Sequence, residues 1–188
     1  LAVVRSTVPH GIIKSIDTST AEKMPGVFGF VTAKDIKGTN LLRQVHPDQP
    51  VLCEDKVRIL GDPIIAVAAE TREQARAAAV AVKVEYELLP VQMTPAESMA
   101  PGAYVIHPHA PDNVCCSQPL IKGDAEAALK ESKIVYEAEF GTQTNHQAPL
   151  EPEVSSAYFE GEGENRELVI VGRRINIHFH LNQLKEAL

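Results

Sequence analysis

The chain has 188 residues and a formal net charge of −7, from 18 basic and 25 acidic side chains. A chain of this length can bury roughly 70% of the surface that its unfolded form exposes, which permits one good core or two small ones. The sequence is acidic overall and contains no cluster of basic residues, which argues against nucleic-acid binding. No run of about 18 apolar residues and no leader-like start occurs, so we expect a soluble, intracellular protein.

The first 55 residues predict a series of short elements. β-Branched residues indicate strands over 1–7 and 11–16, and the turn formers between them are compatible with a hairpin. A short helix over 20–24, a strand over 27–31 and at most one helical turn over 33–36 follow. Residues 37–52 show no sustained period, so we expect a long surface loop there.

Residues 56–90 carry the strongest pattern and predict a strand, a helix and a second strand. The apolar run over 63–69 is too short for a helix and suits a central strand covered on both faces. Thr71 and Gln74 have the spacing of a capping box, so a helix should begin there. In this helix the small residues share one face, which would lie close against a sheet: Ala75, Ala78, Ala79 and Val82. Residues 83–89 then alternate as a half-buried strand.

Beyond residue 90 the chain predicts a connector and a second unit. Residues 91–119 are rich in proline and have few regular patterns, so we expect an extended connector. Asp124 can cap a helix that ends at Glu131, and residues 134–142 alternate as a strand. Strands over 154–159 and 167–171 flank a glycine-rich turn and predict a hairpin, followed by a helix from about Phe179.

The cysteines and the paired histidines are the first candidates for chemistry. Cys53 and the adjacent Cys115 and Cys116 fit neither a disulfide framework nor a zinc pattern, so we expect reduced thiols. The pair His178 and His180 has i, i+2 spacing, which separates the side chains on a strand or a helix. The second pair, His107 and His109, stands in the connector, where histidine is most often solvated. We expect no metal ligand in this chain.

A second candidate is an acid/base group of His146, Glu151 and Glu153, because a histidine near carboxylates can be tuned toward neutral pH. Prolines flank this stretch, and a buried glutamate could equally satisfy loop amides. No nucleophile stands in a matching arrangement, so we assign no catalytic residue. No GxGxxG or GxxxxGK pattern occurs, which gives nucleotide binding little support.

Short motifs in a fixed order connect the chain to a known family. They are RSTVPH at 5–10, IDTS at 16–19 with Ala21, MPGV at 24–27, KDI at 34–36, VRILGDP at 57–63, AET at 69–71 and VEYELLP at 84–90. Their order resembles the α/β hammerhead domain of the xanthine dehydrogenase and aldehyde oxidase family. The second unit resembles the opening of that family's molybdenum-binding domain, with its Q-H-E-P segment represented by Gln143, His146, LEPE at 150–153 and Ala157. The stretch 172–178 looks closer to the aldehyde oxidoreductase branch.

The resemblance implies a mixed α/β (α+β) fold: a hammerhead domain over 1–90, a connector over 91–119 and the first part of a molybdenum-binding domain over 120–188. It also implies an enzyme that hydroxylates aldehydes or aromatic heterocycles with a molybdenum-pterin cofactor and passes electrons to iron-sulfur clusters, with FAD in some members. The family's glycine-rich cofactor loop and glutamate base lie downstream, so the cofactor-binding residues here are unknown. We expect a cytoplasmic fragment that is inactive alone; a self-standing binding or assembly module is the alternative.

Overall fold

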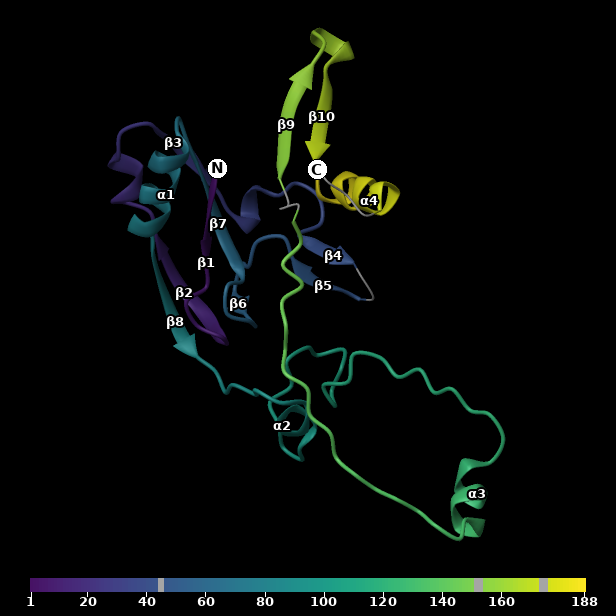
Figure 1. Ribbon diagram of the computed structural model, residues 1–188. Helices are drawn as coiled ribbons and strands as arrows, with labels where there is room; N and C mark the ends of the chain where they lie inside the picture. The colour runs from purple at the N-terminus through teal and green to yellow at the C-terminus, as the bar shows by residue number, and fades with distance from the viewer. Residues whose placement is uncertain (44–45, 151–153, 173–175) are drawn as a thin grey trace. The chain divides into compact units, whose positions relative to one another are not determined.

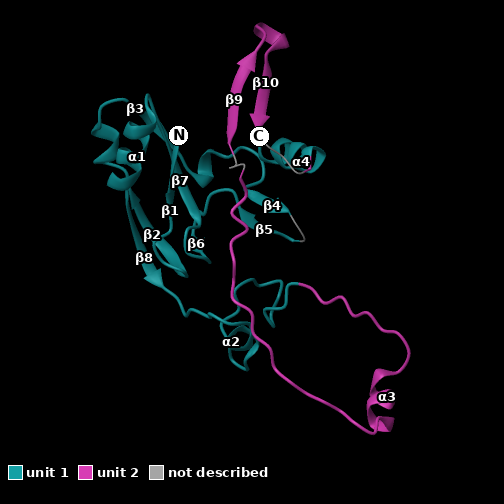
Figure 2. Ribbon diagram, viewed as in Figure 1, with its two compact units in different colours: residues 1–115, 177–188 teal, residues 116–176 magenta. Residues whose placement is uncertain are grey.

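The computed structural model describes residues 1–43, 46–150, 154–172 and 176–188 (Figure 1). The chain forms two compact units, one of residues 1–115 with 177–188 and one of residues 116–176 (Figure 2). Among the residues described, no helix combines the length and apolar character needed to cross a membrane. The predicted mixed α/β fold is confirmed.

The first sheet of unit 1 is antiparallel and has β7 (Pro63–Ala69) at its centre, between β1 (Ala2–Arg5) and β3 (Val27–Val31). The predicted central strand is therefore confirmed. Ile65 and Val67 of β7 are 1% and 0% exposed, because α1 and its neighbours cover this face of the sheet. A strand with buried side chains along its length needs the uninterrupted apolar sequence that β7 has.

Helix α1 (Arg72–Ala81) begins at the predicted capping box and packs on this sheet. The Thr71 hydroxyl accepts from the amide of Gln74 at 3.2 Å, and the Gln74 side chain accepts from the amide of Thr71 at 2.9 Å. Ala75 and Ala78 are fully buried, as the small-residue face predicts. Small side chains let the helix backbone approach the sheet, which positions the strands on either side of it.

The second sheet of unit 1 has the order β6 (Lys56–Val57), β2 (Gly11–Asp17) and β8 (Lys83–Leu88). Strands β1 and β2 thus join different sheets, so the predicted hairpin between them is wrong. The two strands contribute to different cores, which explains the separation. Val4 of β1 lies in the core under α1, whereas Ile13 of β2 packs on a second core around Val57 and Ile64. The predicted strand over 83–89 is confirmed.

Residues 37–52 are not the irregular loop that the sequence predicts. They contain β4 (Leu41–Arg43) and β5 (Pro47–Pro50), which pair antiparallel. Asn40 closes the base of this hairpin, since its amide donates to the Leu52 carbonyl at 2.7 Å and its oxygen accepts from the Leu52 amide at 3.1 Å. These side-chain bonds supply the order that periodicity does not. The short 3₁₀ turns η1 (Ala21–Lys23) and η2 (Ala33–Asp35) agree with the predicted short helices.

Residues 91–115 of the predicted connector belong to unit 1 and contain a short helix. Helix α2 (Pro95–Met99) is capped by the Thr94 hydroxyl, which accepts from the Glu97 amide at 3.2 Å. The Tyr104 hydroxyl lies 3.0 Å from the Lys56 ammonium, and its ring meets the buried His10 ring edge-on with centroids 4.9 Å apart. This part of the chain is therefore not simply extended.

Helix α4 (Ile177–Ala187) also belongs to unit 1 and confirms the helix predicted from about Phe179. The carbonyls of Ala187 and Glu186 accept from the amides of Gly38 and Thr39 at 3.1 and 2.7 Å. A Cβ atom on Gly38 would fall 2.1 Å from the Glu186 carbonyl oxygen, so only glycine permits this approach.

Unit 2 contains α3 (Ala125–Glu131), β9 (Ser155–Glu160), β10 (Glu167–Gly172) and the 3₁₀ turn η3 (Gly163–Asn165). Asp124 caps α3, and β9 pairs antiparallel with β10, so the predicted helix and hairpin are confirmed. The strand predicted over 134–142 is wrong, because these residues have no regular structure. A strand needs a partner for its backbone groups, and none of the described strands pairs with this segment.

Candidate functional site

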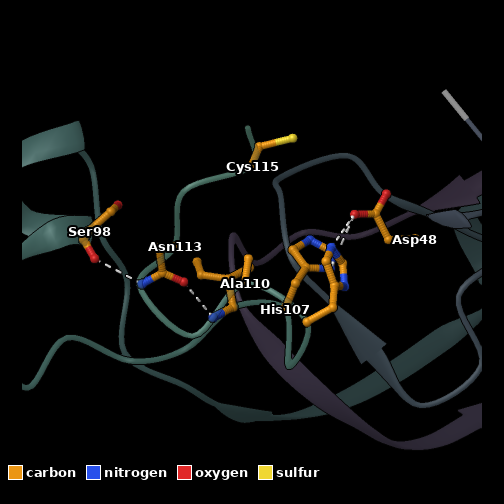
Figure 3. A pocket seen from close by; sticks show the side chains of 8 residues that line it. Asp48, Ser98, His107, Ala110, Asn113 and Cys115 are labelled. Carbon is orange, nitrogen blue, oxygen red and sulfur yellow. Dashed lines mark hydrogen bonds and ion pairs between the residues drawn. The ribbon is translucent and has the colours of Figure 1, made fainter. Parts of the chain in front are cut away.

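The loop that follows α2 is shaped by a single asparagine. Asn113 has the left-handed φ of 57°, a conformation that asparagine tolerates better than most residues. Its side-chain oxygen accepts from the Ile106 amide at 2.9 Å, and its side-chain nitrogen donates to the Ser98 carbonyl at 2.8 Å (Figure 3). The same nitrogen donates to the Tyr104 carbonyl at 2.9 Å. These three bonds fix the backbone on both sides of His107 and His109.

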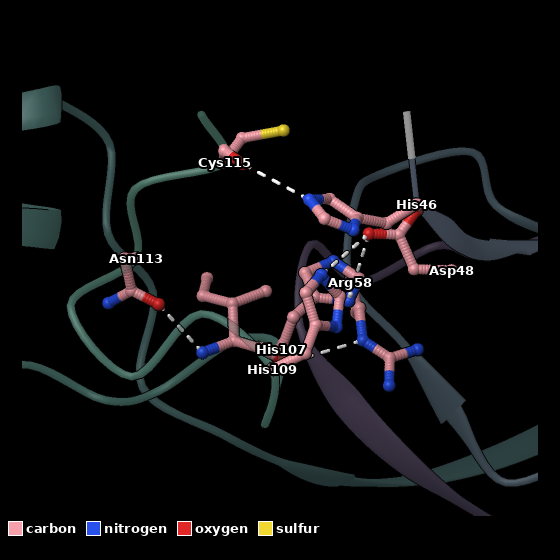
Figure 4. Close-up of polar contacts among 8 residues, drawn as sticks. His46, Asp48, Arg58, His107, His109, Asn113 and Cys115 are labelled. Atoms are coloured by element: carbon pink, nitrogen blue, oxygen red, sulfur yellow. Dashed lines mark hydrogen bonds and ion pairs between the residues drawn. The ribbon is translucent and has the colours of Figure 1, made fainter. Parts of the chain in front are cut away.

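Two imidazoles of this loop face one carboxylate of β5. The Nε2 atom of His109 lies 3.2 Å from Oδ2 of Asp48, and Nδ1 of His107 lies 3.8 Å from the same oxygen (Figure 4). One potential ligand atom from each of the three residues lies within 4.8 Å of the other two. The structure thus brings Asp48 together with two histidines that follow it by 59 and 61 positions in the sequence. We refer to Asp48, His107 and His109 as the His-Asp-His cluster.

Arg58 sets the electrostatics of the His-Asp-His cluster. Its Nε–H donates to the carbonyl of Ile106 at 3.3 Å, so its side chain is tied to the backbone next to His107. Burial lowers the pKa of His107, and the positive charge of the Arg58 guanidinium lowers it further against the opposing effect of Asp48. This shift favours the neutral His107 imidazole, which keeps a lone pair on one ring nitrogen.

A third histidine borders the His-Asp-His cluster. The His46 ring centroid lies 4.7 Å from that of His109, and its Nε2–H donates to the Cys115 carbonyl at 3.3 Å. Two cavities open beside these residues. One of about 280 Å³ is lined by the cluster together with Ile106, Asn113 and Cys115, and the other of about 550 Å³ includes the cluster and Arg58. The cluster is therefore accessible to solutes.

The other histidine pair does not converge in this way. His178 and His180 lie on α4, where i, i+2 spacing separates their side chains by about 200° around the helix, as predicted. The three cysteines are free thiols, with Cys53 buried and Cys115 and Cys116 exposed, which confirms the expectation from their spacing. Burial, reinforced by the charge of Asp62, raises the pKa of Cys53 to about 12.

The acid/base candidate is only partly described. His146 is exposed, and its Nδ1 accepts from the Ala148 amide at 2.8 Å. Glu151 and Glu153 lie outside the described residues. Gln143 is exposed in a stretch without helix or strand. The described residues of this segment therefore do not assemble an acid/base group.

Sequence reasoning missed Asp48 and His46 as members of a site. In each of the two segments, two residues that can bind a metal stand two positions apart: His46 and Asp48, and His107 and His109. This spacing was the only sequence pattern in these segments that pointed to a site. The spacing did not suffice, because nothing local indicates that β5 and the loop after α2 come together. That proximity depends on the β4–β5 hairpin and on the Asn113 bonds.

Comparison with known proteins accounts for both parts of the chain. Residues 1–90 match the model of the a/b hammerhead domain of aldehyde oxidase and xanthine dehydrogenase, and residues 106–188 match that of the molybdopterin cofactor-binding domain. The chain belongs to the aldehyde oxidase and xanthine dehydrogenase family. The matched residues 1–90 contain the two sheets and α1 of unit 1.

Relatives come from both branches of the aldehyde oxidase and xanthine dehydrogenase family. The chain is 38% identical to an aldehyde oxidoreductase of Megalodesulfovibrio gigas, over 96% of this chain and 21% of the relative. It is 41% identical to a subunit of a probable xanthine dehydrogenase of Bacillus subtilis, over 86% of this chain and 21% of the relative. The chain thus spans about a fifth of the length of these two relatives.

A solved structure supports the same assignment. The crystal structure of the aldehyde oxidoreductase from Desulfovibrio desulfuricans matches with a TM-score of 0.88 and 36% identity, covering 100% of this chain and 21% of that chain. Because the relatives include both an aldehyde oxidoreductase and a probable xanthine dehydrogenase, the closeness to the aldehyde oxidoreductase branch stays a prediction.

The described residues of the segment that contains Gln143 and His146 do not by themselves enclose a pterin. A pterin needs several hydrogen-bond donors that converge on one cavity. Gln143 and His146 are exposed, and a Cβ atom on Gly141 would meet nothing within 4 Å, so no neighbouring residue encloses Gly141.

Proposed function

We propose that this chain is a structural part of the large subunit of a molybdenum-pterin oxidoreductase that hydroxylates aldehydes or aromatic heterocycles. The observation that carries the proposal is the pair of adjoining family matches, over residues 1–90 and 106–188, in the order hammerhead then cofactor-binding domain. The molybdenum-pterin group would supply the oxidation chemistry, with oxygen derived from water. The present residues would supply the scaffold.

The proposal includes a division of the chain into the hammerhead domain over 1–90, the connector over 91–119 and the first part of the molybdenum-binding domain over 120–188. Several large apolar side chains of unit 2 are at least 85% exposed, which supports an incomplete second domain. They are Leu120, Ile134, Tyr136, Phe140 and Leu150. Fully exposed large apolar groups mark surfaces that meet another part of the protein. We propose that the remaining molybdenum-binding domain covers them.

The proposed partners of the whole enzyme are an iron-sulfur domain or subunit, with or without FAD, and a small aldehyde or heterocycle. We place the enzyme in the cytoplasm. These parts of the proposal come from the family resemblance and not from a contact in this chain.

The experiment compares the isolated 188-residue chain with the complete subunit that carries it, both expressed in a host that makes the molybdenum cofactor. We expect the subunit to retain stoichiometric molybdenum through gel filtration and to oxidise benzaldehyde with a dye as electron acceptor. The isolated chain should do neither, because binding requires the convergent donors that it lacks. A subunit without molybdenum or activity contradicts the enzyme proposal and favours a binding module, and molybdenum bound to the isolated chain contradicts the structural role.

A further inference from the structure

We propose that the His-Asp-His cluster is a binding site for a divalent first-row transition-metal ion of the Zn²⁺ type, separate from the molybdenum chemistry of the family. Nδ1 or Nε2 of His107 and His109 and one carboxylate oxygen of Asp48 would be the protein ligands. This goes beyond the proposed function, and it departs from the sequence-based expectation that the chain holds no metal ligand.

The spacing of the ligand atoms fits such an ion. Bonds of about 2.0–2.1 Å in a tetrahedral site place neighbouring ligand atoms about 3.3 Å apart. The distances from Asp48 Oδ2 to His109 Nε2 and to His107 Nδ1 are 3.2 and 3.8 Å. All three ligand atoms lie within 4.8 Å of one another, so small side-chain rotations suffice to close the site.

The ligand chemistry also selects the class of ion. Two imidazoles with one carboxylate suit Zn²⁺ and its neighbours, whereas Mg²⁺ and Ca²⁺ prefer oxygen ligands. Three protein ligands leave a fourth position open, which solvent can fill. The two cavities beside the cluster allow an ion to enter from solvent.

The loop geometry holds the ligands in place without the ion. Asn113 fixes the backbone on either side of His107 and His109, and the β4–β5 pairing holds Pro47 and Gln49 on either side of Asp48. Ligands that are oriented by surrounding hydrogen bonds lose less freedom when the ion binds. The positive charge of Arg58, whose Nε–H donates to the Ile106 carbonyl next to His107, opposes a second cation and should limit the affinity of the site.

The direct test is calorimetric titration of the metal-free subunit that carries this chain with Zn²⁺. We expect one equivalent per subunit from this site. Asp48→Asn and His109→Gln should each weaken binding by more than the roughly 10–100-fold that the loss of an outer-shell partner costs. His178→Gln on α4 is the matched control, because it removes an exposed imidazole outside the cluster. Arg58→Gln should tighten binding, since it removes the opposing charge.

Two further measurements keep the test decisive if a variant is unstable. Melting temperatures in EDTA should be the same for the parent and the cluster variants, since the ion is then absent from both. In the unmodified subunit, Zn²⁺ should protect His107 and His109 from diethyl pyrocarbonate but leave His178 reactive. The proposal is overturned if the parent binds no Zn²⁺, if both cluster variants bind it as tightly as the parent, or if protection is uniform across the histidines.

Discussion

At the scale of single residues, Asp62 has two separate effects. Its Oδ2 accepts from the amides of Arg58 and Ile59 at 2.7 and 3.1 Å, which closes the turn before β7. Its negative charge also disfavours ionisation of Cys53, whose pKa is raised to about 12 mainly by burial. The same carboxylate therefore shapes the backbone and keeps a nearby thiol protonated.

Thiol labelling tests this difference among the cysteines. At pH 8, iodoacetamide should modify the exposed Cys115 and Cys116 within minutes and leave Cys53 unmodified, because a buried thiol with a raised pKa supplies almost no thiolate. In denaturant all three should react, which is the control. Mass spectrometry of the digested chain reports each site, and equal labelling of Cys53 in the native chain would contradict the structure.

The raised pKa also gives a pH dependence with a definite sign. From about pH 9, the ordinary thiol value of 9.0, the unfolded state releases a proton that folded Cys53 keeps until about pH 12. The unfolded state then binds fewer protons, so the free energy of unfolding falls as the pH rises through this window. A Cys53→Ala variant should lose part of this decline, as urea denaturation at pH 8 and pH 10 would show.

At the scale of elements, α1 shows how a narrow apolar face becomes a close contact. Ala78 is fully buried between the helix and the sheet, whereas its neighbour Ala77 is exposed. Both residues occupy the same helix and have the same intrinsic helix preference. Substitutions at these two positions therefore distinguish the effect of packing against the sheet from the effect of helix propensity.

Replacing Ala78 with leucine should destabilise unit 1 by about 1–3 kcal/mol, because extra volume in a filled contact forces the backbone or its neighbours to move. Ala77→Leu should change stability by no more than about 0.5 kcal/mol, as surface substitutions usually do. Urea denaturation followed by circular dichroism gives both values. Equal midpoints for the two variants would place Ala78 away from the sheet.

Elements with a strong local pattern could be predicted from the sequence. The run in β7, the capping box of α1 and the alternation in β8 each combine a period with a boundary residue. The β4–β5 hairpin was missed because its order comes from Asn40 and not from alternation. The strand over 134–142 failed for the opposite reason, since alternation without a partner does not make a sheet. The His-Asp-His cluster was missed because contacts distant in sequence create it.

At the scale of the whole molecule, the two units differ in how much they bury. Unit 1 contains two apolar cores, whereas the described side chains of unit 2 are almost all exposed. A segment with few buried contacts opens at little cost in free energy. The described part of unit 2 should therefore be the less protected part of the isolated chain.

Limited digestion of the isolated chain with a lysine-specific protease tests this difference. Cleavage should occur first at Lys122, Lys130 and Lys133, which are exposed on or beside the short helix α3 and the irregular chain around it. Lys56 and Lys83, in strands of the second sheet, should be cut later. Mass spectrometry of early fragments gives the order, and early cleavage at Lys56 or Lys83 would contradict the division.

The attachment of α4 to residues 38–43 has a consequence for biosynthesis. The amides of Gly38 and Thr39 are paired with carbonyls from the end of α4, and the Gln183 side chain donates to the Arg43 carbonyl at 3.2 Å. A ribosome adds about 5–20 residues per second, so it needs roughly 3–12 s to make residues 116–176. During that interval the nascent hammerhead can form its sheets but presents these backbone groups to water or to chaperones. Unit 1 therefore cannot be completed before α4 has been synthesised, however early its sheets form.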